Sequence, residues 1–390
     1  MAYAITCASY RLIDLLKMIG GPSIVGLVRD HLQSIQSLDF PELANELDTG
    51  QKYTLLVNAR LAPTRNRFGL LQELVAGAKP VIYTDNGQLA IAVVETESLK
   101  GDPMAIIETL TNKPDSNAVQ ADGCLFHFPH DVIRENMDAF NDNMELRLAS
   151  GSYTEIADGV FSAAPTKLPD NVVFDSGPGP IVFEDNVSFG PYSFIRGPVY
   201  IGPNCKVNEH SAIKDAVSLA HTIKIGGEVE GVVIEAYSNK QHLGFLGHSY
   251  LGSWINLGAG TCNSDLKNTY GLVNVQYDSG KVSSGMQFVG CAIGDYTKTA
   301  INTSIFTGKM IGAGSMLYGF VTSNVPCFVN YAKSFDQMTV QPAEVLITTQ
   351  KRMFARRKVE HRPADIQLVK DMFELTKHER PELSADPLAF

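Results

Sequence analysis

The strongest constraint on the fold is a series of apolar residues spaced six positions apart. Seven of them follow in unbroken succession: Phe189, Ile195, Ile201, Val207, Ile213, Leu219 and Ile225. The same six-residue spacing returns at Phe245, Leu251 and Leu257, and again at Ile293, Thr299, Ile305, Ile311 and Leu317. A six-residue period fits neither an α-helix nor a flat strand, because turns must interrupt the strand every few residues. Residues 171–333 are therefore predicted to form a parallel β-helix with these side chains stacked inside it.

The segments on either side of the repeat have other patterns. Residues 1–167 predict an α+β domain, with a strand at 53–58, a helix at 68–76, a hairpin around residues 85–87 and a helix at 131–148. A turn-rich linker at 163–179 sets the boundary near residue 168. Residues 336–390 contain two helical patterns, 343–359 and 363–377, which would cap the coil. The predicted fold class is mainly β, with the coil at 168–335.

Composition limits the function classes. The net charge of −10 argues against general nucleic-acid binding, so a phosphate-bearing partner would need a local cationic site. Six cysteines without paired spacing predict reduced thiols and a cytoplasmic location. No apolar run reaches membrane-spanning length, and Arg11, Asp14 and Lys17 interrupt the start of the chain. Neither a membrane span nor a signal peptide is therefore expected.

One stretch of the repeat region carries a more specific pattern. It reads His242-Leu243-Gly244-Phe245-Leu246-Gly247, and nine residues later Asn256-Leu257-Gly258-Ala259-Gly260-Thr261-Cys262-Asn263. This pattern resembles the acetyltransferase half of the bacterial bifunctional N-acetylglucosamine-1-phosphate uridylyltransferase/glucosamine-1-phosphate acetyltransferases. The resemblance implies a left-handed coil, acetyl-CoA as acyl donor, an amino-sugar phosphate as acceptor, and a homotrimer with the acyl site between neighbouring coils.

The resemblance also assigns roles to residues. The implied catalytic group is His242, Asn263 and Ala259; the substrate group is Arg196, Glu230, Phe245, Asn256 and Lys267; and the acetyl-CoA group is Ala259, Gly260, Cys291 and Asp295. His242 matches the general base, and imidazole suits that role because its pKa lies near neutrality. The Ala259 N–H would hold the oxyanion, and Arg196 would hold the sugar phosphate. Phe245 replaces a family tyrosine that binds the phosphate, which leaves the acceptor sugar open.

Each of these residues also has a purely structural interpretation. His242 would be a surface histidine, Asn256 an asparagine ladder residue and Arg196 a solvated corner, while the glycines at 258 and 260 would serve coil geometry. The basic run 351–358 is either a solvated helix face or a surface that attracts the phosphates of coenzyme A.

Other functions stay open. The N-terminal half of the family transfers a uridylyl group with a Gly-x-Gly-Thr-Arg loop, which is absent here; the nearest run is 61–67. The run 57–61 nevertheless resembles a divergent sugar nucleotidyltransferase branch, so nucleotidyl transfer with Mg²⁺ is the alternative function. A third is a zinc lyase of the carbonic-anhydrase type with ligands from His210, His221, His242 or His248. A fourth is a non-catalytic scaffold. The pair His127 and His130 is a weak metal pattern, and no resident metal is predicted.

Overall fold

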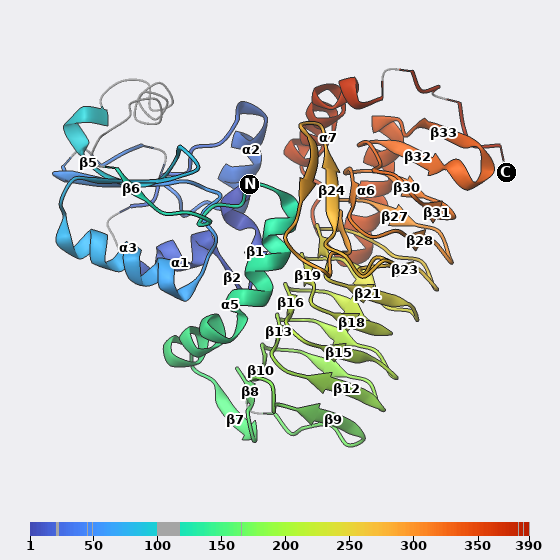
Figure 1. Ribbon diagram of the computed structural model, residues 1–390, viewed down its shortest axis with the longest axis horizontal. Helices are drawn as coiled ribbons and strands as arrows, with labels where there is room; N and C mark the ends of the chain where they lie inside the picture. Colours follow the sequence, from blue (N-terminus) through green and yellow to red (C-terminus); the bar gives the residue numbers. More distant parts are fainter. Residues whose placement is uncertain are drawn as a thin grey trace. The chain divides into compact units, whose positions relative to one another are not determined.

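The protein divides into two compact units. The computed structural model describes every residue except 21–22, 45, 49, 100–117, 165, 381, 385 and 390. The units are Met1–Phe128 and Pro129–Phe390 (Figure 1). Each has its own apolar core. The boundary near 168 that the sequence suggests differs from this division, because the segment from residue 129 to 162 packs with the coil.

The first unit is built around one mixed sheet. The sheet has the strand order β3-β5-β4-β6, with β3 (Tyr53–Val57), β4 (Val81–Asp85), β5 (Gln88–Glu95) and β6 (Val119–Gln120). With it go a hairpin of β1 (Thr6–Cys7) and β2 (Tyr10–Arg11), and the helices α1 (Leu12–Ile19), α2 (Asp30–Asp39) and α3 (Arg65–Gly77). Asn86 and Gly87 have φ angles of 48° and 73°, which form the tight turn between β4 and β5. The expected α+β composition and the hairpin are confirmed.

Three parallel sheets form the walls of the coil, and the chain visits them in a fixed order on each turn (Figure 1). The first face contains β10 (Ile181–Phe183), β13 (Val199–Ile201), β16 (Val217–Leu219), β19 (Val233–Ile234), β22 (Tyr250–Leu251), β26 (Cys291–Ile293) and β29 (Lys309–Ile311). The second face contains β11 (Ser188–Phe189), β14 (Lys206–Val207), β17 (Lys224–Ile225), β20 (Asn239–Lys240), the bridging residue Asn256, β27 (Lys298–Thr299), β30 (Met316–Leu317) and β32 (Val329–Ala332), closed by the antiparallel β33 (Gln337–Val340). The third face contains β9 (Val172–Asp175), β12 (Ser193–Arg196), β15 (Ala212–Lys214), β18 (Glu228–Glu230), β21 (Phe245–Gly247), β23 (Cys262–Asn263), β28 (Ser304–Ile305) and β31 (Phe320–Val321). The corners that join the faces are called the 1/2, 2/3 and 3/1 corners. The mainly β class and the repeat architecture are confirmed.

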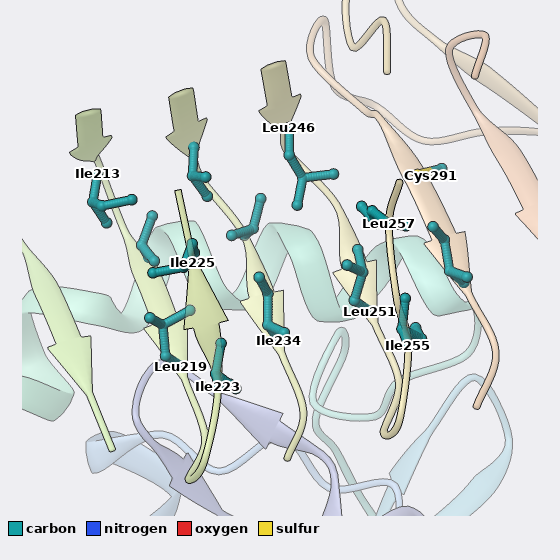
Figure 2. Packing of buried hydrophobic residues seen from close by; sticks show 14 of the residues in the cluster. Ile213, Leu219, Ile223, Ile225, Ile234, Leu246, Leu251, Ile255, Leu257 and Cys291 are labelled. Carbon is teal, nitrogen blue, oxygen red and sulfur yellow. The ribbon is translucent and has the colours of Figure 1, made fainter. Parts of the chain in front are cut away.

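The repeated apolar residues do fill the interior. Figure 2 shows Ile213, Leu219, Ile225, Leu251 and Leu257 pointing into the coil, and all are buried. Removing such side chains from water is the main source of stability in a solenoid of this kind.

The six-residue phase is wrong at Phe245. Leu246 is the inward residue, at 2% exposure, while Phe245 lies on the outer surface. The cause is turn length: Ile213 pairs with Val229 and Val229 with Leu246, so these turns contain sixteen and seventeen residues instead of eighteen. The two turns together lack three residues of a regular repeat, so the inward position falls on Leu246 and not on Phe245.

Further elements cover or extend the coil. The helix α5 (Pro129–Ser150) donates a hydrogen bond from Asn136 Nδ2 to Ala216 O at 2.8 Å, and is followed by β7 (Thr154–Ala157) and β8 (Val160–Ser162). Because β8 pairs with β10, and β9 pairs with β12, the coil begins before the expected linker, which itself contributes a strand. Residues 264–290 leave the coil and form the hairpin of β24 (Asn274–Tyr277) and β25 (Gly280–Ser283). The expected C-terminal helices are α6 (Ala343–Arg357) and α7 (Pro363–Leu375). Within the described ranges, no helix combines the length and apolarity that a membrane span requires.

Candidate functional site

The 2/3 corner brings together two of the residues in the implied catalytic group. His242 is exposed and lies between β20 and β21, and Ala259 lies on the next turn of the same corner. The two turns are joined by a hydrogen bond from Gly260 N to Leu243 O, at 3.1 Å. Ala259 O accepts from Asn302 N at 2.7 Å, whereas the Ala259 N–H has no partner among the described residues. This half-buried, unpaired N–H lies on the turn next to the one that carries His242, and it is available to a ligand.

A buried lysine holds the loop that carries His242. Lys240 pairs with Ile225 on the second face, so its side chain enters the coil where an apolar residue would otherwise lie. Its Nζ donates to the carbonyl oxygens of Gly226, His242 and Gly244, at 2.8, 2.8 and 2.7 Å. Burial lowers the pKa of Lys240 from its usual 10.5 to about 8. Sequence reasoning missed this residue, although it stands where the apolar repeat breaks.

The glycines of the corner are required by its backbone. A Cβ on Gly258 would lie 2.6 Å from Ala300 O, and a Cβ on Gly244 would lie 2.1 Å from Thr261 O. Neither obstacle is the mobile end of a side chain, so no larger residue fits. The glycines therefore serve coil geometry, and at the same time they keep the surface around Ala259 open.

Arg196 occupies the third face between two carboxylates. It follows Phe194 and Ile195 in β12, and its Nε lies 3.8 Å from Asp175 Oδ2 and 3.6 Å from Asp215 Oδ1. That Nε is buried and makes no hydrogen bond in the part of the chain that is described. The arginine expected to hold a phosphate is thus already flanked by negative charge.

Glu230 lies on the same ladder, in an anionic cluster. Lys214 Nζ contacts Glu230 Oε2 at 2.9 Å and Glu228 Oε1 at 3.0 Å, and hydrogen bonding to these two carboxylates raises the pKa of Lys214.

A second set of contacts involves the turns that follow Glu230. His248 Nδ1 lies 2.8 Å from Asp265 Oδ2. Donor atoms of Glu230, His248 and Asp265 lie within 4.8 Å of one another, so this trio could hold a divalent cation. Sequence reasoning missed His248 and Asp265 as partners, since they come from different turns.

Two residues of the implied groups lie inside the coil. Asn263 is buried; its Oδ1 accepts from Gly247 N at 2.8 Å, and its Nδ2 donates to Gly247 O at 3.0 Å. Cys291 belongs to the apolar column and has no exposed surface (Figure 2). Both side chains have structural contacts that account for their presence.

The remaining residues of these groups lie on other surfaces. Asn256 is on the second face, where its Oδ1 accepts from Asn239 Nδ2 at 3.5 Å, as in the asparagine-ladder interpretation. Asp295 Oδ1 accepts from Ser253 N at 2.7 Å, at the 1/2 corner. Lys267 Nζ donates to Leu272 O at 2.9 Å, in the excursion after β23. The ring of Phe245 is outward on the third face. Within a single chain, the residues of the implied substrate group therefore lie on two different faces of the coil, the second and the third.

The four histidines of the zinc alternative do not gather in one chain. His210 and His242 lie at the 2/3 corner two turns apart, and His210 stacks on Tyr192 with ring centroids 5.4 Å apart. His221 lies at the 1/2 corner, and His248 lies at the 3/1 corner.

In the first unit, the run 61–67 leads from β3 into α3, and Thr64 caps the helix by accepting a hydrogen bond from Arg67 N at 3.4 Å.

The two histidines of the weak metal pair lie near other polar side chains, and the first of these is Asp85. Asp85 is fully buried and accepts hydrogen bonds from Leu125 N at 2.8 Å and Gly123 N at 3.2 Å. Although burial alone would raise the pKa of Asp85, these backbone N–H groups and His127 hold it below its usual value. His127 Nε2 lies 3.2 Å from Asp85, and His130 Nδ1 lies 2.6 Å from Tyr277 Oη, so each histidine of the weak metal pair has a protein partner.

Comparison with known proteins agrees with the resemblance drawn from the sequence. A relative from Sulfurisphaera tokodaii, named bifunctional sugar-1-phosphate nucleotidylyltransferase/acetyltransferase, is 32% identical over 41% of this chain and 39% of its own length. The bifunctional protein GlmU of Bartonella quintana is 25% identical over 60% of this chain and 48% of its own length. The chain thus spans less than half the length of these curated relatives. Among solved structures, the UDP-N-acetylglucosamine acyltransferase of Francisella novicida aligns with a TM-score of 0.38 at 13% identity, over 60% of this chain and 97% of that chain. Residues 2–151 match the family described as sugar nucleotidyl transferase, and the chain is similar to bifunctional nucleotidylyltransferase/acetyltransferases.

Proposed function

We propose that the coil is an acetyl-CoA-dependent N-acetyltransferase that acts on an amino-sugar phosphate. The observation that carries the proposal is the placement of His242 and the unpaired Ala259 N–H on successive turns of one corner. An acyl transfer to an amine needs one group to remove a proton and another to stabilise an oxyanion. The names of the relatives, which include acetyltransferase activity, support the same reaction class.

In the proposed reaction, the acceptor amine attacks the thioester carbonyl carbon directly. His242 takes a proton from the nitrogen as the N–C bond forms, and the Ala259 N–H donates to the oxyanion of the tetrahedral intermediate. Collapse of the intermediate breaks the C–S bond, and the leaving thiolate takes up a proton to become coenzyme A. No residue needs to be acylated, so Cys291 can remain inside the coil.

We further propose a homotrimer as the active form. The substrate group is divided, with Asn256 on the second face and Arg196 and Glu230 on the third. A neighbouring copy that presents its third face to the second face of the first would unite the two halves. A cytoplasmic location is proposed because all six cysteines are free thiols.

The test of the main proposal is release of coenzyme A from acetyl-CoA across a panel of amino-sugar phosphates. His242→Gln is expected to lower kcat by 10²–10⁴-fold, the usual effect of losing a general base. His221→Gln, at the exposed 1/2 corner, is the matched control and should keep the wild-type rate. An unchanged rate in His242→Gln would remove the proposed mechanism.

A second proposed function is nucleotidyl transfer by the first unit. It is favoured by the match of residues 2–151 to the sugar nucleotidyl transferase family, and would use Mg²⁺ with a nucleoside triphosphate. The measurement is pyrophosphate release from UTP or dTTP with a sugar 1-phosphate in the presence of Mg²⁺. Absence of release with every sugar tried would reject this activity while leaving the acetyltransferase proposal intact.

A further inference from the structure

A column of polar side chains runs along the outside of the second face. Lys206 pairs with Lys224, Lys224 with Asn239, and Asn239 with Asn256, so these residues follow one another on successive turns. Neighbouring strands are about 4.8 Å apart. The column therefore places two ammonium groups and two amides in a line about 15 Å long.

The end of α6 adds two arginines to this column. Arg357 Nη2 donates to Asn239 Oδ1 at 2.6 Å. The helix is held there by Phe354, which is buried and stacks on Trp254 with ring centroids 4.4 Å apart. The position of Arg356 and Arg357 near the coil thus follows from a packed aromatic contact.

The four cations of this second-face cluster, Lys206, Lys224, Arg356 and Arg357, are not balanced by nearby acids. None of them forms an ion pair with any residue that the structure describes. Burial, followed by repulsion from Arg357, Arg356 and Lys206, lowers the pKa of Lys224. On the third face, by contrast, Arg196 and Lys214 each lie between two carboxylates.

In a chain with a net charge of −10, four unbalanced cations concentrate positive potential at one place. Such a place attracts phosphate, and arginine can contact it through two N–H groups at once. Because the cluster extends over two ladder steps, about 10 Å, it is longer than a single phosphate needs.

We propose that Lys206, Lys224, Arg356 and Arg357 bind the diphosphate of a ligand whose reacting end lies at the 2/3 corner. Asn239 and Asn256 precede His242 and Ala259 by three residues, which is about 10 Å of extended chain. This separation suits a ligand with a diphosphate at one end and an amine or thioester at the other. Coenzyme A and a nucleoside diphosphate-linked amino sugar both have this chemistry. The choice of ligands rests on the proposed acetyltransferase function.

The test is calorimetric binding of inorganic pyrophosphate, coenzyme A and UDP-glucosamine to the full chain. The double variant Lys224→Gln/Arg357→Gln is expected to weaken pyrophosphate binding at least tenfold, and wild-type affinity should fall as salt rises. Lys351→Gln/Arg352→Gln removes the same amount of charge from exposed positions of α6, five residues before Arg356 and Arg357, and should bind like the wild type. Circular dichroism and the Tm of each variant check that the fold is kept.

Competition with pyrophosphate shows which of the two ligands supplies the diphosphate that the cluster binds. If coenzyme A displaces pyrophosphate, the cluster serves the acyl donor; if only UDP-glucosamine does, it serves the acceptor. Wild-type protein that binds no pyrophosphate at millimolar concentration, or a double variant that binds it unchanged, would overturn the assignment. So would a double variant whose oligomeric mass changes while its pyrophosphate affinity does not, because the cations would then belong to an interface. Pyrophosphate binding is independent of acetyl transfer, so either proposal can fail without the other.

Discussion

Lys240 gives the sharpest prediction about how the coil supports its 2/3 corner. Its Nζ makes three hydrogen bonds of 2.7–2.8 Å to carbonyl oxygens, and two of those carbonyls belong to the loop that carries His242. Lys240→Met fills the same interior position with an unbranched apolar chain of similar length. The substitution therefore removes the ammonium and leaves three carbonyl oxygens to find other donors.

The expected cost follows from two opposing terms. A hydrogen bond from a charged donor contributes about 1.5–3 kcal/mol, and three are lost. Against this, the pKa of Lys240 falls from 10.5 to about 8, which corresponds to about 3 kcal/mol of penalty for the buried charge, at about 1.4 kcal/mol per tenfold change. Because Lys240→Met carries no charge, this cost of burial is absent in the variant and is subtracted from the loss of the three hydrogen bonds. The free energy of unfolding should therefore fall by about 3 kcal/mol.

Urea unfolding followed by circular dichroism measures this difference directly. Lys281→Met, in the hairpin strand β25, is a control for loss of a lysine at an exposed position and should change stability by less than about 0.5 kcal/mol. If Lys240→Met is as stable as the wild type, the three carbonyls are satisfied without the ammonium and the reasoning is refuted. Acetyl transfer by the variant should also fall, because the loop that holds His242 is no longer tied from inside.

Three further perturbations test other parts of the structure. Gly258→Ala should lower stability by about 1–3 kcal/mol, since its Cβ would lie 2.6 Å from Ala300 O, and a wild-type urea midpoint would contradict this. Burial lowers the pKa of Lys298 to about 7, so between pH 7 and 10.5 the folded state binds fewer protons than the unfolded state, and stability from this group rises with pH. The stability of the wild type relative to Lys298→Met should therefore increase by about 2 kcal/mol from pH 7 to pH 9, and a constant difference would be inconsistent with a lowered pKa. Trp254 is the single tryptophan, so Phe354→Ala should shift its fluorescence to longer wavelength as water reaches the ring; an unshifted spectrum would mean that α6 does not cover it.

The coil could be predicted because its core repeats a simple physical requirement. Each inward position of a regular turn needs an apolar side chain, so the six-residue period from Phe189 to Ile225 is visible without any alignment. The period fails at Phe245 because the preceding turns are shorter than eighteen residues and Lys240 occupies an inward position. Turn length depends on how corners close, which the apolar pattern alone does not encode. The first strand of the coil, β8, was missed because it precedes the turn-rich segment 163–179, whose composition predicts a linker although the segment contains the coil strand β9.

The candidate site was only partly predictable. His242 and Ala259 are close in the sequence, and placing them on one corner required only the correct repeat. The trio of Glu230, His248 and Asp265 was not foreseen, because its members lie on three turns and meet only when the shortened register is known. The second-face cluster was missed as well, since it depends on where α6 returns to the coil, and no local pattern fixes that position.

The central claim is that acyl transfer takes place at the 2/3 corner. The most direct test compares kcat/KM for acetyl transfer in His242→Gln and His248→Gln, measured with the best acceptor from the panel. Our account predicts a loss of at least 100-fold for His242→Gln, and a change of less than about threefold for His248→Gln, whose partner Asp265 lies at a different corner. A large loss for His248→Gln with little effect of His242→Gln would contradict the account, because the proton would then be removed at the Glu230, His248 and Asp265 cluster.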